Sequence, residues 1–77
     1  MTALDDDTRR WLHKRASYEA RRLRRGAQRR RDMAEGCPDG MARSMLRMAD
    51  TLDESAERWR LIAQATKAMT KTDQENS

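Results

Sequence analysis

Apolar side chains recur along the second half of the chain in alternating steps of four and three residues. The stripe consists of Met41, Met45, Met48, Leu52, Ser55, Trp59, Ile62, Thr66 and Met69. Three alanines, Ala49, Ala56 and Ala63, widen it on one side. This spacing places side chains on one face of an α-helix and is typical of helices that pair with another helix. The pattern predicts a long helix over about 39–69.

A weaker seam of the same kind predicts a first helix over about 5–35. Its members are Leu12, Ala16, Glu19, Leu23, Gly26 or Ala27, Arg30, and Met33 or Ala34. Three aspartates and a threonine at positions 5–8 are typical of a helix start, because they combine a capping side chain with negative charge at the positive end of the helix dipole. Good helix formers dominate the residues that follow.

The sequence Gly-Cys-Pro-Asp-Gly at positions 36–40 separates the two segments. A glycine just past a helix, followed by proline and aspartate, ends one helix and starts the next. Two long helices with a short connection form an antiparallel hairpin. Residues whose numbers add up to about 76, such as Leu23 and Leu52, are expected to face each other. We predict one all-α domain over residues 1–77, with a frayed polar tail over about 70–77.

The chain is too short to bury a large core by itself. It has 77 residues and a single cysteine, Cys37, so no intrachain disulfide can staple it. Oligomerisation is the remaining way to bury more surface, and we predict that two hairpins form a four-helix bundle. The residues expected in the core or dimer seam are Leu12, Leu23, Met45, Met48, Leu52, Trp59 and Ile62. Leu46 and Leu61 lie off this seam and favour a further contact between subunits.

Positive charge is concentrated in the first predicted helix. Residues 9–31 contain eleven basic side chains and one acid, Glu19, although the formal charge of the whole chain is only +4. Like charges at helical spacing destabilise a helix, so something must offset their repulsion. An acidic cluster on the second helix offers part of the answer. It consists of Asp50, Asp53, Glu54 and Glu57, and the predicted register places it opposite Arg22, Arg24 and Arg25.

Aromatic rings alternate with guanidinium groups along one face of the first helix. The residues expected to bind a partner on this face are Arg10, Trp11, Lys14, Arg15, Tyr18, Arg21, Arg22, Arg25 and Arg29, with Arg24 also facing phosphates. Rings and arginine planes stack on bases while the charges meet phosphates, so this face suits RNA or DNA. Alternatively, arginine stems cover the two rings in a dimer interface, or the face meets an acidic protein surface.

Residue types that carry catalysis or bind metals are sparse. His13 and Cys37 each occur once, and no spacing matches a metal site. His13 stands among cations, which favours a neutral, solvated ring. A two-helix hairpin offers no concave pocket for a small-molecule substrate. We therefore expect a protein that is not an enzyme and that uses no cofactor or metal.

The start of the chain lacks the basic and apolar segments of a signal peptide, and no apolar run approaches membrane-spanning length. These features favour a cytoplasmic protein with no membrane partner.

The predicted layout of two helices, one short turn and a small-residue seam resembles that of the Rop-type plasmid proteins. In that family two hairpins form an antiparallel four-helix bundle that binds paired RNA loops. The resemblance concerns layout and no residue motif, and it implies a hairpin homodimer. The leading functional hypothesis is a small regulatory protein that presents its arginine-rich helix to RNA, DNA or a nucleoprotein complex.

Two other hypotheses stay open. One is a protein-interaction module, such as a phage- or plasmid-type inhibitor or adaptor that binds a host protein. In the other, the charge only specifies self-assembly, and arginines of one subunit meet the acidic cluster of the next.

Overall fold

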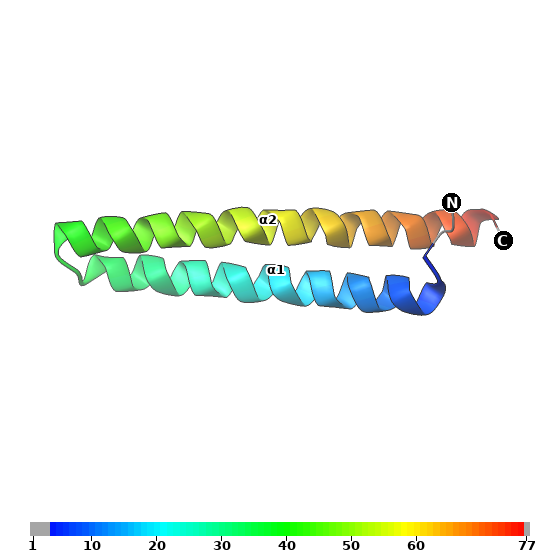
Figure 1. Cartoon of the computed structure of the whole chain (residues 1–77), viewed down its shortest axis with the longest axis horizontal. Coiled ribbons are helices and arrows are strands. Elements are labelled where there is room, and N and C mark those ends of the chain that lie inside the picture. Colours follow the sequence, from blue (N-terminus) through cyan, green and yellow to red (C-terminus); the bar gives the residue numbers. More distant parts are fainter. Residues whose placement is uncertain (1–3, 77) are drawn as a thin grey trace.

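The chain folds into a helical hairpin. A computed structural model describes the backbone of residues 4–76 and the side chains of residues 4–69. Helix α1 spans Asp6–Glu35 and helix α2 spans Asp39–Asn76. The two helices run antiparallel on either side of the turn at Gly36, Cys37 and Pro38, and they form a rod of 58 × 19 × 16 Å (Figure 1). The predicted all-α hairpin is confirmed.

Local hydrogen bonds fix the start of α1. The Asp5 carboxylate accepts a hydrogen bond from the backbone N–H of Thr8 at 2.7 Å, and Asp6 and Asp7 place negative charge in the first turn. Hydrogen bonds from the backbone and the hydroxyl of Thr8 hold the pKa of Asp5 below its usual value. The predicted acidic helix start is therefore confirmed, with Asp5 as its cap.

The turn ends α1 as the sequence predicts. The N–H groups of Gly36 and Cys37 donate to the carbonyls of Met33 and Ala34, each at 3.2 Å, and satisfy acceptors at the helix end. The Cys37 thiol donates to the Met33 carbonyl as well.

Helix α2 continues to Asn76, so its predicted end at about residue 69 is too early. The polar segment after Met69 contains no glycine or proline that would stop a helix. Whether this end frays stays a prediction.

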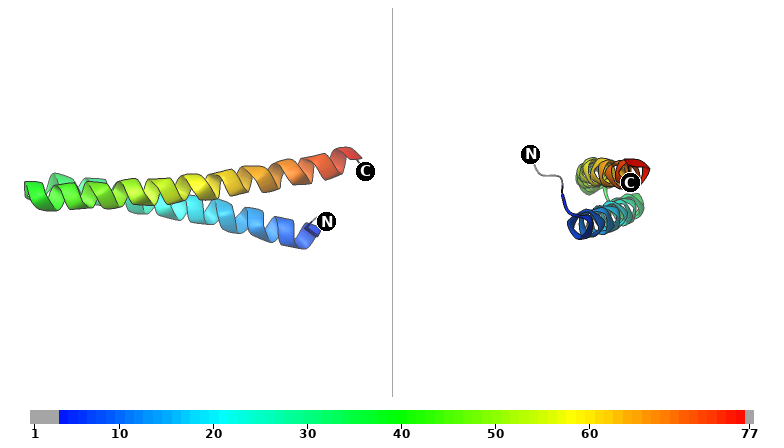
Figure 2. Two further views of the ribbon diagram at one scale, coloured as in Figure 1. Left: turned by 45° about the horizontal axis from the view of Figure 1, so that its top comes forward. Right: turned by 90° about the vertical axis from the view of Figure 1, so that its right-hand side faces the viewer.

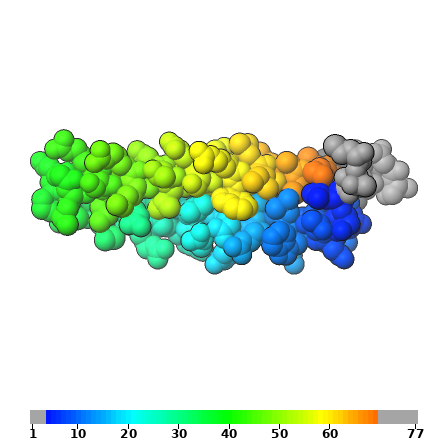
Figure 3. Space-filling model, in the orientation of Figure 1, coloured from blue at the N-terminus to red at the C-terminus, as the bar shows by residue number. Residues whose placement is uncertain are grey.

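Small residues hold the two helices together. The buried apolar residues are Ala16, Ala20, Ala27 and Ala34 of α1 and Ala49 and Ala56 of α2. Within the described side chains, no larger side chain is fully buried. Alanines at the contact let the helix backbones approach closely, and the two helices cross at a shallow angle (Figure 2). The space-filling view shows the two helices side by side along the rod (Figure 3). The hairpin therefore has a thin core, as its length leads one to expect.

The residues predicted for the core or dimer seam fall into two groups in the hairpin. Met48 and Ile62 are 48% and 37% exposed, so they do not belong to the core of the hairpin, and their place in a dimer seam stays a prediction. The other predicted seam residues are half-buried, namely Leu12, Leu23, Met45, Leu52 and Trp59. The physical reason is the size of the side chains. Ala49 and Ala56, each one residue after a position of the predicted seam, let the backbone of α2 come closer to α1 than Met48 would.

Ion pairs between the two helices line one long side of the hairpin. Arg31 Nη2 lies 3.5 Å from an Asp50 oxygen and also pairs with Asp53, and Arg24 Nη2 lies 3.6 Å from a Glu57 oxygen. Exposed pairs of this kind contribute only about 0–1 kcal/mol each.

The prediction of which arginines pair with the acidic cluster is only partly correct. Arg24 pairs with it as predicted, but Arg22 pairs with Glu19 of its own helix. Within the described residues Arg25 forms no recorded ion pair. The reason is geometric: Arg24 and Arg31 flank the seam, whereas Arg22 and Arg25 lie further around α1 and point away from α2.

His13 is part of the contact between the helices. Its Nδ1 lies 2.9 Å from the Ala63 carbonyl and 3.1 Å from the Thr66 hydroxyl. Because a carbonyl oxygen can only accept, Nδ1 carries the hydrogen. The expectation of a solvated ring is wrong, since His13 stands at a seam position three residues before Ala16. The register is right, because the residue numbers of His13 and Ala63 add up to 76.

Over the part of the chain that the structure describes, neither helix contains an apolar stretch long enough to cross a membrane.

Candidate nucleic-acid interface

The candidate site is the surface of α1 that points away from α2, which we call the basic face. It consists of Arg10, Trp11, Lys14, Arg15, Tyr18, Arg21, Arg22, Arg25 and Arg29, and all nine side chains are exposed. Trp11 and Tyr18 are 63% and 50% exposed. The alanine seam explains this placement, because Trp11, Tyr18 and Arg25 follow one another at heptad spacing on the opposite side of the helix. The structure therefore brings the predicted binding residues together on one surface.

Glu19 neutralises part of the basic face. Its carboxylate lies 2.8 Å from Arg22 Nη2 and 3.3 Å from Arg15 Nη2, and Glu19 is only 7% exposed. The hydrogen bond from Arg22, together with the charges of Arg22 and Arg15, lowers the pKa of Glu19 against the opposing effect of burial. The same contact raises the pKa of Arg22. Arg15 and Arg22 are thus held in place beside one shared counter-charge.

Five cations of the basic face lack such a counter-charge. They are Arg10, Lys14, Arg21, Arg25 and Arg29, and among the residues that the structure describes none of them forms a recorded ion pair. An external anion would relieve their mutual repulsion, and dissolved salt would screen it. Arg24, which was also expected to face phosphates, is drawn to the flank of the hairpin by Glu57.

Two further arginines of the basic run belong to the hairpin itself. Arg9 is 5% exposed and pairs with Asp6, and Arg30 is half-buried in a groove that it lines with Met48, Thr51 and Leu52. The sequence contains a signal for their placement, because both continue the four-and-three spacing of the alanines in α1. Arg30 was indeed predicted as a member of the weaker seam, whereas Arg9 was counted only with the basic run because it precedes the first predicted seam residue, Leu12.

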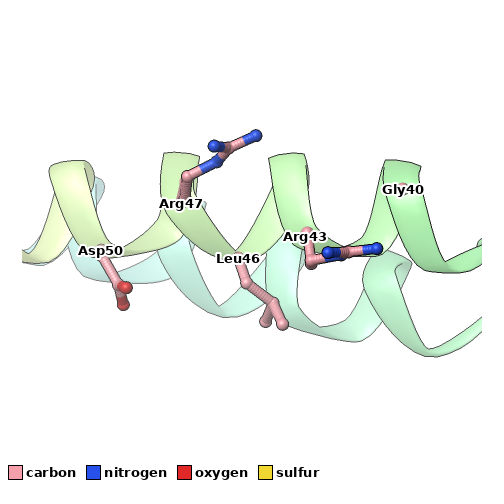
Figure 4. A pocket seen from close by; sticks show the side chains of 5 residues that line it. All are labelled: Gly40, Arg43, Leu46, Arg47 and Asp50. Carbon is pink, nitrogen blue, oxygen red and sulfur yellow. The ribbon is translucent and has the colours of Figure 1, made fainter.

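A shallow hollow lies on α2 close to the turn. It is lined by Gly40, Arg43, Leu46, Arg47 and Asp50 (Figure 4). The side chains of Arg43, Arg47 and Asp50 diverge in the close view and do not converge on a common point. All five residues come from one helix, so the hollow is a dip in the surface between neighbouring turns, without the enclosing walls that small-molecule sites need.

Chemistry beyond charge and stacking has little support in the described region. There, no three histidine, cysteine or acidic side chains come together in a way that could hold a metal ion. Cys37 is a free, half-buried thiol in the turn. The arrangement can attract anions, donate hydrogen bonds to phosphates from the guanidinium groups, and offer two flat rings for stacking.

Comparisons with protein-family models, with curated proteins and with solved structures give no match. The resemblance to the Rop-type proteins therefore stays one of layout.

Proposed function

We propose that this protein is a non-catalytic binding protein that presents the basic face of α1 to RNA, DNA or a nucleoprotein complex, and that it works as a homodimer of hairpins forming a four-helix bundle. The observation that carries the proposal is a group of five exposed cations, which form no ion pair with the side chains of residues 4–69, beside two exposed rings. A polyanion would offset the repulsion among these cations and gain affinity by releasing counterions.

The rings favour nucleic acid over an acidic protein surface. Trp11 precedes Arg15 by four residues, and Tyr18 precedes Arg22 by the same step, so each ring lies beside a guanidinium plane on one face. Bases stack on both kinds of group, whereas carboxylates on a protein need only the charge.

A charge-neutralising pair tests the proposal. Arg21→Gln/Arg25→Gln removes two unpaired cations one helical turn apart. Arg43→Gln/Arg47→Gln is the matched control, because it removes the same charge at the same spacing from α2, where both arginines are exposed. Binding to mixed-sequence RNA and DNA is measured by gel shift over a series of salt concentrations. We expect the first variant to weaken binding and to flatten the salt slope on duplex DNA by about 1.8, at about 0.9 for each lost phosphate contact.

The control variant should keep nearly the wild-type slope, since net charge alone is not the cause. Equal losses in the two variants would show non-specific attraction to any cation. No binding by the wild-type protein at low salt would refute the proposal outright.

A second candidate function is a protein-interaction module that acts on a host protein. It is favoured by Leu46 and Leu61 of α2, which are 43% and 52% exposed and lie outside the alanine seam. A pull-down after nuclease treatment separates the two functions. A stoichiometric protein partner that survives the nuclease and is lost in Leu61→Asp, but not in Arg21→Gln/Arg25→Gln, would favour the module.

A further inference from the structure

Helix α2 carries a second line of residues at heptad spacing, next to the line that packs on α1. The line consists of Met41, Ser44, Met48, Thr51, Ser55, Arg58, Ile62, Ala65 and Met69, which we call the methionine stripe. It follows alternating steps of three and four and is displaced by one residue from the seam that contains Ala49 and Ala56. A helix with two adjacent seams can pack against two different helices.

The hairpin leaves most of this stripe exposed, although Ser44 and Ser55 are half-buried and Arg30 of α1 lines a groove beside Met48 and Thr51. Its four large side chains, Met41, Met48, Ile62 and Met69, are 59%, 48%, 37% and 37% exposed. Arg58 is its only charged member, whereas acidic and basic residues make up much of the remaining exposed surface of α2. The stripe runs for about 42 Å and is about 10 Å wide, which gives roughly 400 Å². This area is comparable to the largest apolar patch of a typical monomer, which often has a function, so the case for a partner depends on what fits the stripe.

The stripe is complementary to itself when it is reversed. Ser55 stands at its centre, Met48 and Ile62 stand seven residues to either side, and Met41 and Met69 stand fourteen to either side. In an antiparallel pair of α2 helices with the two-fold axis at Ser55, Met48 of one copy therefore meets Ile62 of the other. Each terminal methionine meets the opposite one, and the smallest side chain of the heptad line lies where the two helices cross.

The charges at the centre also match. Arg58 and Glu54 are exposed, and neither takes part in a recorded ion pair among the described residues. In the antiparallel arrangement, Arg58 of each copy lies beside Glu54 of the other, so the pair occurs twice about the axis. The single charge of the stripe thus finds a partner in a second copy of the chain.

We propose that two copies of this protein pair through the methionine stripe, with their α2 helices antiparallel and centred on Ser55. This inference rests on the homodimer of the proposed function and assigns its surface. It leaves the basic face of α1 uncovered in both copies, because that face points away from α2.

Cysteine cross-linking tests the surface and the direction together. In a Cys37→Ser background, Ser55→Cys should form a disulfide-linked dimer on mild oxidation, because the two Ser55 positions meet at the axis. Met48→Cys should not, because its two copies lie about 21 Å apart along the axis, far beyond the reach of a disulfide. A mixture of Met48→Cys and Ile62→Cys should cross-link. Gln64→Cys is the matched control, since Gln64 is exposed on another face of α2.

Two results would overturn the proposal. Cross-linking of Ser55→Cys no stronger than that of Gln64→Cys would show that the stripe is not the contact. Efficient cross-linking of Met48→Cys alone would show a parallel pair.

Sedimentation of a charged variant gives an independent measurement. Met48→Glu/Ile62→Glu should raise the dimer dissociation constant by at least about 100-fold, because burying unpaired carboxylates is costly. The helical circular dichroism of the hairpin should persist, since both side chains are exposed in it. Gln64→Glu should sediment like the wild type.

A folded wild-type monomer at micromolar concentration would refute the proposal. These measurements use nuclease-treated protein without nucleic acid, so their failure would leave the salt-dependence test of the basic face untouched.

Discussion

The basic face of α1 and the methionine stripe of α2 are both largely exposed in the hairpin, yet their chemistry fits opposite kinds of partner. The basic face carries five cations with no recorded ion pair among the described residues, and the stripe carries one charge in nine positions. An anion reduces the repulsion among the cations of the basic face. Another apolar surface removes the thioether and aliphatic side chains of the stripe from water. The comparison teaches that the two surfaces differ more in charge content than in exposure, and that charge content indicates which kind of partner each surface fits.

Both surfaces follow from the use of alanine at the contact between the helices. Ala16, Ala27, Ala49 and Ala56 are completely buried, and the larger side chains lie beside or behind them. A seam of small residues holds the helices close but buries little apolar area. Met41, Met48 and Met69 and the rings of Trp11 and Tyr18 are therefore left exposed on the outside of the hairpin, whereas Met45 and Trp59 are half-buried in it.

The largest effect is expected when the rings are removed from the basic face. Trp11→Ala/Tyr18→Ala should weaken binding to single-stranded RNA by about 1–3 kcal/mol for each base that stacks, or roughly 5- to 150-fold for each ring. Titration followed by fluorescence anisotropy of a labelled oligonucleotide measures the loss. The sedimentation of the protein should not change, because the rings lie away from the methionine stripe.

The control for lost apolar surface is Leu61→Ala on α2, which is exposed to a similar extent as Tyr18. A variant without the two rings that binds RNA normally and sediments as a monomer would reverse the comparison, because it would place the rings in the dimer interface.

A smaller effect should come from strengthening the hairpin itself. A Cβ atom added at Gly26 would lie 3.5 Å from Leu52 Cδ1, which is ordinary contact, and the backbone there is not in the left-handed region. A glycine inside a helix costs about 0.5–1 kcal/mol relative to alanine. Gly26→Ala should therefore raise the free energy of unfolding by about that amount in urea denaturation.

Where wild type and Gly26→Ala are both fully folded, the variant should bind polyanions and dimerise with the same affinities as the wild type. A Gly26→Ala variant that is less stable than the wild type would mean that the added methyl group clashes with α2 at this point of the seam.

The smallest effect on stability is expected from replacing Glu19, the acid that neutralises part of the basic face. Its pKa in the folded chain lies below the ordinary glutamate value of 4.5, mainly because of the hydrogen bond from Arg22. The ionised carboxylate therefore stabilises the fold above pH 4.5, and this contribution is lost as the pH falls through the lowered pKa. Thermal unfolding of wild type and Glu19→Gln, above and below that pH, should show a shallower loss of stability in the variant.

The same variant frees Arg15 and Arg22 from their counter-charge. Its salt slope for nucleic-acid binding should become steeper, by about 0.9 for each additional phosphate contact on duplex DNA. An unchanged slope would show that these two arginines do not reach the polyanion.

Much of the fold could be predicted from the sequence because local signals agree. The acids at Asp5 and Asp6, the glycine–proline turn and the uninterrupted helix formers place both helix starts and the turn within a residue of their observed positions. The basic face was predictable for the same reason, because the spacing of Trp11 and Tyr18 fixes their common face once the segment is helical.

The choice between adjacent seams could not be predicted from spacing alone. Met48 and Ala49 each belong to a line with four-and-three steps, and hydrophobicity favours the methionine, whereas close packing of two backbones favours the alanine. The structure uses Ala49 for the contact within the hairpin and leaves Met48 exposed. Packing between two elements decides this point, and single-helix patterns do not contain it.

Side-chain partners were the least predictable feature. Arg22 could reach an acid on either helix, and the structure pairs it with Glu19, three residues away. His13 was taken for a solvated ring because its neighbours in sequence are cations, but its partners are Ala63 and Thr66 across the hairpin. Such contacts depend on the rotation of each helix about its own axis.

The length of α1, which is 30 residues, has a consequence for the nucleic acid that the proposed function requires. From Arg10 to Arg29 the basic face extends over about 28 Å, which corresponds to about eight base pairs along the axis of a duplex. This is less than one turn of B-form DNA, which takes about 10 base pairs. If the proposed function holds, a helix of this length would lie along one groove without forcing the duplex to bend, and the length of a single helix would set the footprint of each hairpin.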